Sequence, residues 1–219
     1  NSIGEKNIDI SNSNIEVYGA YRNEFGNDNN RSISIIVQRN FLNLVSEGST
    51  IEVTAPNAEF RYLGQREVEF ENLSFTAPGG AVRLYSAWHE EPMNINELSF
   101  NSSARIEGSF NANVVRFGAG GRYRFGADRN YEIGDIIAAG DCVEGVIVTS
   151  NVPGVSANFM MASGTVTLNY ITSRDIHLSG GSIEAINGVD LGNNQGWNFT
   201  NSNAVDFYWI GGTGQWDDP

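Results

Sequence analysis

The sequence predicts an all-β fold, and specifically a right-handed parallel β-helix in which short strands coil around one apolar core. Three observations predict it: short segments that alternate apolar and polar residues, turn-forming residues between them, and a strand-like line that recurs along the chain. A β-sandwich is the alternative. Its antiparallel hairpins would need two-residue turns such as Asn-Gly or Asp-Gly, and Asn187-Gly188 is the only such pair.

The composition is consistent with one domain of many short strands. A chain of 219 residues can enclose one real all-β core but leaves too little for two comfortable domains. It holds 25 glycines with 11% aromatic and 18% charged residues, which suits strands joined by tight turns.

The charge and hydropathy of the chain exclude two classes of partner. The formal net charge is −13, so nucleic acids and anionic membranes would be repelled. Membrane insertion is also excluded, because the longest uncharged stretch, residues 145–173, is interrupted by polar residues, Pro153 and Gly154. No signal peptide is visible at the first residues. We therefore expect the sequence to be a fragment of a longer protein. The single cysteine, Cys142, has apolar neighbours that predict a buried thiol.

The first series of strands is predicted from residue 50 onward. Alternation predicts strands at residues 51–53, 60–63, 68–70, 73–75 and 82–85. Pro56-Asn57 and the glycine-containing segments 78–80 and 118–121 mark turns between strands.

The recurring line predicts stacking of like residues. Residues 71–75, 96–100 and 113–117 resemble one another and end in Phe75, Phe100 and Phe117, which are 25 and then 17 residues apart. In a solenoid such lines lie on successive turns, with like positions on like positions.

One segment fits two structures. Its apolar residues have helical spacing, although residues 32–35 alternate as a strand would, and this alternation slightly favours the strand. A short helix that caps the open end of the β-helix would use the same residues, which are Ile33, Ile36, Val37, Phe41, Leu44 and Val45.

No group of residues predicts catalysis. The one dense titratable cluster, His89-Glu90-Glu91, precedes Pro92 and is interpreted as a solvated loop rather than an acid/base site. His177 is remote in sequence, and neither histidine has the spacing of a zinc site. We therefore expect no catalytic residues, no cofactor and no enzyme activity.

Arginines recur on the polar side of the predicted strands, and stacked turns could align some of them into a ladder. Pairing with glutamates and aspartates on adjacent turns is the favoured interpretation. A glycan-binding strip with Tyr62, Tyr85, Trp88 and Tyr123 as stacking partners is the alternative. The arginines are Arg61, Arg66, Arg83, Arg105, Arg116, Arg122, Arg124 and Arg129.

Two turns carry oxygen ligands of the kind that Ca²⁺ prefers, without the spacing of a defined calcium loop. One holds Asp190, Asn193 and Asn194, and the other holds Asn27, Asp28 and Asn29. We expect Asx hydrogen bonds within the turns to account for both sets, with bound calcium as the weaker alternative.

The last third of the chain carries the motifs ASGTVT-x₂-Y-x₄-DI at residues 162–176 and D-x-GNN-x-GW-x-F at residues 190–199. It ends in FYWIGGTGQWDDP at residues 207–219. These lines resemble repeats of giant surface proteins of Bacteroidota, in which a YWVGGTGNWSDP-like line opens the next repeat. Residues 8–13 and 98–103 are similar to that family's ISNS and LTFNSS lines.

The resemblance implies a repeat unit over residues 1–200 and a junction, or the start of the next repeat, over residues 201–219. It implies export by the type 9 secretion system, a place at the bacterial cell surface, and adhesion, including that of gliding-motility filaments. Expected partners are neighbouring repeats of the same chain and surface polysaccharide; a carbohydrate-binding or carbohydrate-active β-helix is the alternative function. The expected inter-repeat junction is aromatic and consists of Trp197, Phe199, Phe207, Tyr208, Trp209 and Trp216.

Overall fold

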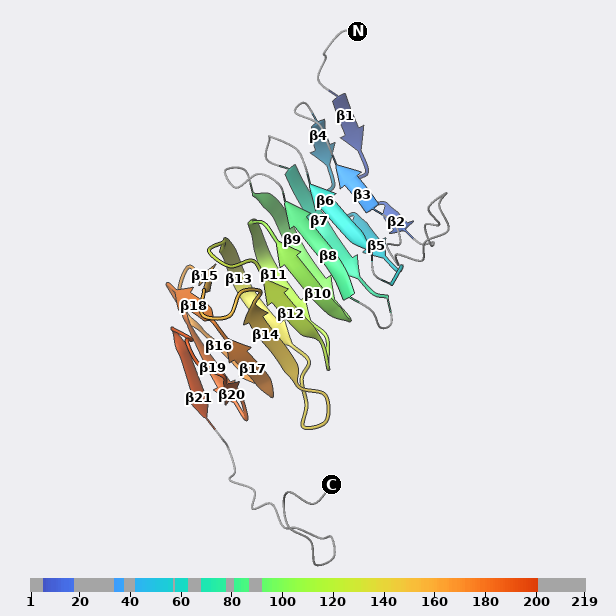
Figure 1. The fold of residues 1–219 in the computed structure, drawn as a ribbon. Helices are drawn as coiled ribbons and strands as arrows, with labels where there is room; N and C mark the ends of the chain where they lie inside the picture. The colour runs from blue at the N-terminus through green and yellow to red at the C-terminus, as the bar shows by residue number, and fades with distance from the viewer. Residues whose placement is uncertain are drawn as a thin grey trace, which may run out of the picture.

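The computed structural model describes residues 6–17, 34–37, 42–56, 58–62, 68–77, 81–86 and 92–200. Every regular element in these ranges is a β-strand, and every strand pairing is parallel (Figure 1). The chain alternates between two long sheets as it advances, so the fold is a parallel β-solenoid and the β-sandwich is excluded.

The first sheet has eight strands stacked in the order of the sequence. They are β2 (Asn14–Val17), β5 (Thr50–Val53), β7 (Val68–Phe75), β9 (Met93–Phe100), β11 (Phe110–Phe117), β13 (Asn130–Ala138), β15 (Ala157–Met160) and β18 (Ile176–Ser179).

The second sheet also has eight strands. Along most of the solenoid, a short connection leads from a strand of the first sheet to the next strand of the second sheet. The strands of the second sheet are β3 (Ser34–Val37), β6 (Glu59–Tyr62), β8 (Ala81–Ser86), β10 (Ser103–Glu107), β12 (Arg122–Phe125), β14 (Val146–Ser150), β17 (Ile171–Arg174) and β20 (Val189–Asp190).

Two smaller sheets complete the described chain. Near the N-terminus, β1 (Lys6–Asp9) pairs with β4 (Leu42–Val45). Near the C-terminus, β16 (Thr165–Asn169), β19 (Ser182–Ile186) and β21 (Trp197–Thr200) form a third wall of the solenoid. The ambiguous segment at residues 33–45 contributes strands β3 and β4; Ile33 and Phe41 lie outside the described residues.

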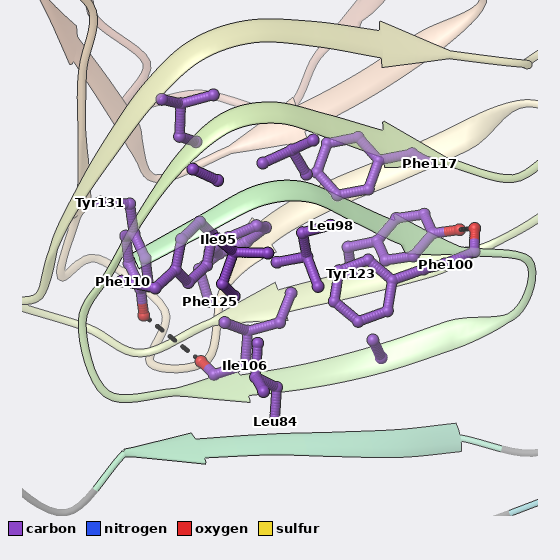
Figure 2. Close-up of a cluster of buried hydrophobic side chains, with 14 of the residues drawn as sticks. Leu84, Ile95, Leu98, Phe100, Ile106, Phe110, Phe117, Tyr123, Phe125 and Tyr131 are labelled. Carbon is purple, nitrogen blue, oxygen red and sulfur yellow. Dashed lines mark hydrogen bonds between the residues drawn. The ribbon is translucent and has the colours of Figure 1, made fainter. Parts of the chain in front are cut away.

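The predicted stacking of like residues is confirmed. Phe75, Phe100 and Phe117 are direct register partners on β7, β9 and β11, and the Phe75 and Phe100 rings stack at 5.2 Å. Figure 2 shows Phe100 and Phe117 in the core together with Tyr123. All three phenylalanines are buried. Tyr123 of the second sheet packs against Phe117, with 4.4 Å between their ring centres. One apolar column thus runs through successive turns and joins the two sheets.

The first sheet bends at one position in each of its long strands. In β7, β9 and β11 the alternation breaks, so that two consecutive residues face outward, and the first of each pair is left out of the strand pairing. In β13 this position is Gly134, where a Cβ atom would lie 2.6 Å from the Asn113 carbonyl oxygen. The bend therefore hollows the outer side of this sheet.

Candidate functional site

A column of polar side chains runs along the outer side of the second sheet. Successive strands β6, β8, β10, β12, β14 and β17 each contribute one residue at the same register position. This arginine column consists of Glu59, Arg83, Arg105, Arg124, Thr149 and Arg174. The expected ladder is confirmed for three of its members, and Arg174 was missed although it ends an alternating strand at 171–174.

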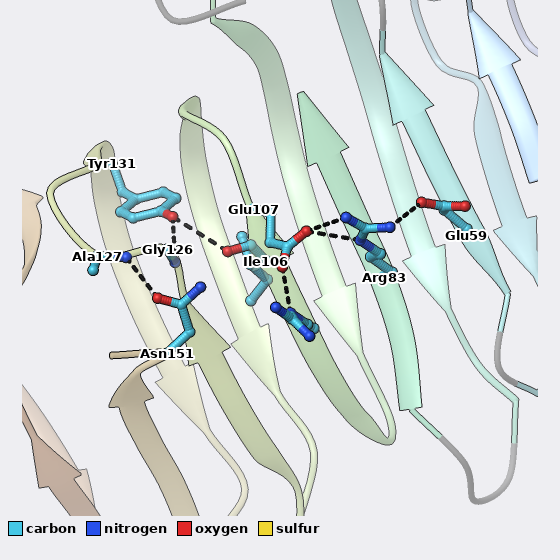
Figure 3. A network of polar contacts seen from close by, with 9 residues as sticks. Glu59, Arg83, Ile106, Glu107, Gly126, Ala127, Tyr131 and Asn151 are labelled. Atoms are coloured by element: carbon cyan, nitrogen blue, oxygen red, sulfur yellow. Dashed lines mark hydrogen bonds and ion pairs between the residues drawn. The ribbon is translucent and has the colours of Figure 1, made fainter. Parts of the chain in front are cut away.

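In the first half of the arginine column the arginines are neutralised. Glu107 accepts a hydrogen bond from Arg83 Nε at 2.8 Å and forms an ion pair with Arg105, while Glu59 lies 2.7 Å from Arg83 Nη1 (Figure 3). Burial alone would lower the pKa of Arg83, but the hydrogen bond and charge of Glu107 raise it. The favoured charge pairing is confirmed here.

In the second half, positive charge is in excess. Among the described residues, no acidic side chain pairs with Arg122 or Arg124, both exposed on β12. Arg174 Nε lies 3.2 Å from Asp175 Oδ2. These three arginines, with Thr149 and Asn151 among others, line a hollow of about 300 Å³. The other predicted arginines lie elsewhere: Arg61 stacks on Tyr85, Arg116 is on the first sheet, Arg129 is in the turn before β13, and Arg66 is outside the described residues.

Two of the four proposed stacking partners of a glycan strip are wrong. Tyr62 and Tyr123 are buried, and Trp88 lies outside the described residues. The Tyr123 hydroxyl donates to the Phe100 and Gly118 carbonyls, each at 3.2 Å, and burial raises its pKa to about 12. Tyr85 alone stays on the outer side, where the guanidinium groups of Arg61 and Arg83 lie 5.2 and 5.0 Å from its ring centre.

The outer side of the first sheet carries amides and carboxylates instead. We call it the asparagine face; it consists of one register column, Glu69, Asn94, Asn111 and Glu132, and a second column at the bend, Glu71, Asn96 and Asn113. Its amides bond along the columns, with Asn111 to Asn94, Asn113 to Asn96 and Asn96 to Glu71 at 2.8–2.9 Å. These residues line a groove of about 610 Å³.

Three carboxylates line this groove; Glu69 and Glu71 are two residues apart on β7, about 7 Å, and Glu132 is distant from both. Glu69 and Glu132 share a column but lie on β7 and β13, three strand spacings or about 14 Å apart along the sheet. Paired carboxylates in glycoside hydrolases are typically about 5–9.5 Å apart. Among the described residues, no three His, Cys, Asp or Glu side chains gather as metal ligands.

Side chains of the C-terminal motifs form hydrogen bonds that link successive turns. Asp175 is buried with a positive φ, and its carboxylate accepts hydrogen bonds from the Gly154 N–H at 3.1 Å and the Asn193 amide at 2.8 Å. Asn194 donates to the Ser173 carbonyl and accepts from the Ile176 N–H.

Asp190 closes its own turn by accepting from the Gly192 N–H at 2.8 Å. The expected Asx bonding is confirmed for Asp190, whereas Asn193 and Asn194 bond to residues 173–176 of the neighbouring turn. Residues 27–29 lie outside the described residues.

One sequence interpretation at a loop is wrong. Cys142 is exposed rather than buried, because it sits in an outward turn beside Val143, which is 86% exposed. Asp141 organises this turn by accepting the Glu144 and Val143 N–H groups, and these bonds lower its pKa. His89, Glu90 and Glu91 lie outside the described residues, and His177 is a half-buried residue of β18.

The described members of the predicted junction lie at the end of the core. Trp197 and Phe199 stack at 5.6 Å with an interplanar angle of 9°, on β21. Their register partners Ile183 and Ala185 are fully buried, but Trp197 and Phe199 are only half-buried against the core. Among the described strands, none pairs with the outer edge of β21. The other predicted members, Phe207, Tyr208, Trp209 and Trp216, lie outside the described residues.

Neither transmembrane helices nor known relatives add to this picture. The described part of the chain holds no helix that could span a membrane. No protein-family model, curated protein or solved structure matches the chain.

Proposed function

We propose that this chain is a non-catalytic structural and adhesive repeat of a large secreted protein of the bacterial cell surface. In this proposal the solenoid is a stiff spacer, and neighbouring repeats of the same chain are its first partners. The Bacteroidota-like motifs support export by type 9 secretion and a role in surface adhesion, including gliding.

The observation that carries the proposal is the aromatic end of the core, which the described residues cover only in part. Trp197 and Phe199 occupy interior columns, where a further turn would bury them as Ile183 and Ala185 are buried. An exposed end of a solenoid costs stability and leaves backbone groups unpaired. A following repeat that packs on this pair would remove both costs.

A tandem of two copies tests the junction. We expect the tandem to unfold at a higher temperature than one copy, since each interface adds stability in a repeat array. Trp197→Ala in the first copy should remove most of this gain. Leu191→Ala, which shortens an exposed apolar side chain outside the end of the core, should leave it. Equal unfolding temperatures for the tandem and the single copy would contradict the proposal.

A carbohydrate-binding or carbohydrate-active β-helix is the second candidate, because the asparagine face forms a polar groove across several strands. Glu69 and Glu132 are too far apart to act as a catalytic pair, and Glu71, the carboxylate near Glu69, accepts a hydrogen bond from Asn96. Assays of polysaccharide cleavage with the native chain and with a His89, Glu90 and Glu91 triple alanine variant separate the two candidates. Turnover that the triple variant loses would overturn the non-catalytic role.

A further inference from the structure

We propose that the hollow between Arg122, Arg124 and Arg174 binds the carboxylate or sulfate groups of an extended acidic polysaccharide. The proposal rests on the adhesive role above and names the class of ligand that this role would need.

The charge balance of the hollow is the first argument. Three arginines line it and no carboxylate is among its other lining residues, in a chain with a formal net charge of −13. Asp175, which is 1% exposed, lies 3.2 Å from Arg174 Nε and compensates that arginine, so the uncompensated charge of the hollow is that of Arg122 and Arg124.

The unpaired state of two arginines is the second argument. Arg83 and Arg105 stand in the same column and are matched by Glu59 and Glu107. In the described chain, no such carboxylate serves Arg122 or Arg124. Guanidinium groups bind carboxylates and sulfates through paired hydrogen bonds, which makes an anionic group the fitting occupant.

Neutral donors complete the hollow. Thr149 lies between Arg124 and Arg174 in the arginine column and presents a hydroxyl group outward. Asn151 accepts the Ala127 N–H at 2.9 Å through Oδ1 (Figure 3), and no described residue accepts a hydrogen bond from its amide nitrogen. Hydroxyl and amide donors beside the arginines suit a sugar ring that carries the acidic group.

The geometry favours a chain-like ligand over a second copy of this protein. Strands in the column repeat about every 4.8 Å, so Arg124 and Arg174 lie about 10 Å apart along the solenoid and can meet successive acidic groups of one polymer. The carboxylates of the asparagine face line a groove, and the arginines also line a hollow. Two concave surfaces do not fit together closely.

Calorimetric titration of the native chain tests the proposal. The probes are alginate, which carries carboxylates, heparin, which carries sulfates, neutral dextran, and sodium sulfate. We expect binding to alginate or heparin but not to dextran, weakened by added salt. Arg122→Gln and Arg124→Gln should each weaken it on the order of tenfold, as expected for a charged hydrogen bond. Arg116→Gln is the control, because it removes a paired arginine on the first sheet.

Several results would overturn the proposal. They are the absence of polymer binding by the folded chain, binding of sodium sulfate alone, and an equal loss in Arg116→Gln. Self-association that Arg122→Gln abolishes, without polymer binding, would assign the hollow to a second copy. The tandem experiment reads the repeat junction separately, so a failure here and a failure of the proposed repeat role are distinguishable.

Discussion

The two eight-stranded sheets enclose the same apolar interior but differ on their outer sides. The asparagine face pairs its amides within itself, since they bond to one another and to Glu71 along the columns. The arginine column pairs its charges only in its first half; Arg124, and Arg122 beside it on β12, have no acidic partners among the described residues. Stacking in register therefore produces self-paired columns where residues of complementary charge or hydrogen bonding occupy successive strands. It leaves unpaired charges where they do not.

The largest effect is expected in the interior that both sheets share. Phe100 is buried between Phe75 and Phe117, so Phe100→Ala should lower the free energy of unfolding by about 3–5 kcal/mol. Urea denaturation measures this loss. Tyr85→Ala, which removes a ring from the outer side, is the control and should cost much less; equal losses would contradict the assignment of inner and outer columns.

A second effect appears in alkaline solution. The pKa of Tyr123 is raised to about 12 in the folded chain, against about 10 when unfolded, so the unfolded state loses its proton first. Stability from this group is complete below pH 10 and is lost as the pH rises toward 12. Tyr123→Phe should flatten this part of the profile of unfolding free energy against pH, although loss of its two hydrogen bonds lowers stability at neutral pH. An unchanged alkaline slope would show that Tyr123 ionises normally.

The asparagine face should contribute a smaller amount. Asn96 donates to Glu71 and accepts from Asn113, so Asn96→Ala should cost about 1 kcal/mol, the usual net value of such bonds. Asn198→Ala on β21 is the matched control, because Asn198 is exposed and makes no side-chain hydrogen bond to a described residue. Chemical unfolding of both variants compares them, and identical stabilities would remove the structural role of the ladder.

The smallest effect is expected from the paired half of the arginine column. Glu107→Gln removes the partner of Arg83 and Arg105 at a site where Glu107 is 16% exposed but its arginines are 37% and 60% exposed, so it should cost about 1 kcal/mol or less, and less still at high salt. Thermal unfolding at two salt concentrations measures it. A loss as large as that of Phe100→Ala would mean that ion pairs rather than the core hold this sheet.

Much of the fold could be predicted from the sequence because its signals are local. The lines that end in Phe75, Phe100 and Phe117 record the register directly, since like residues stack in a solenoid. The outer columns were harder to predict. Turn lengths vary between strands, so the partner of an outward residue cannot be counted from the sequence, and Arg174 was missed for this reason.

Burial at turns was also hard to predict. Cys142 has apolar neighbours, yet its loop points outward, and local composition does not report the direction of a loop. Tyr123 follows the same alternation as the outward arginines beside it, but one residue out of phase, which places it in the core. A shift of one residue exchanges the two sides of a strand.

Retention on immobilised alginate and heparin under a salt gradient tests the central claim most directly, namely that the unpaired arginines form the binding face. Two double variants, Arg122→Gln with Arg124→Gln and Arg105→Gln with Arg116→Gln, each lose two positive charges from a net charge of −13. They therefore have the same net charge and differ only in whether the lost arginines were paired. We predict that the first variant elutes at clearly lower salt than the second, while the second behaves nearly as the native chain. Equal elution of the two variants would contradict the claim, because net charge alone would then govern binding.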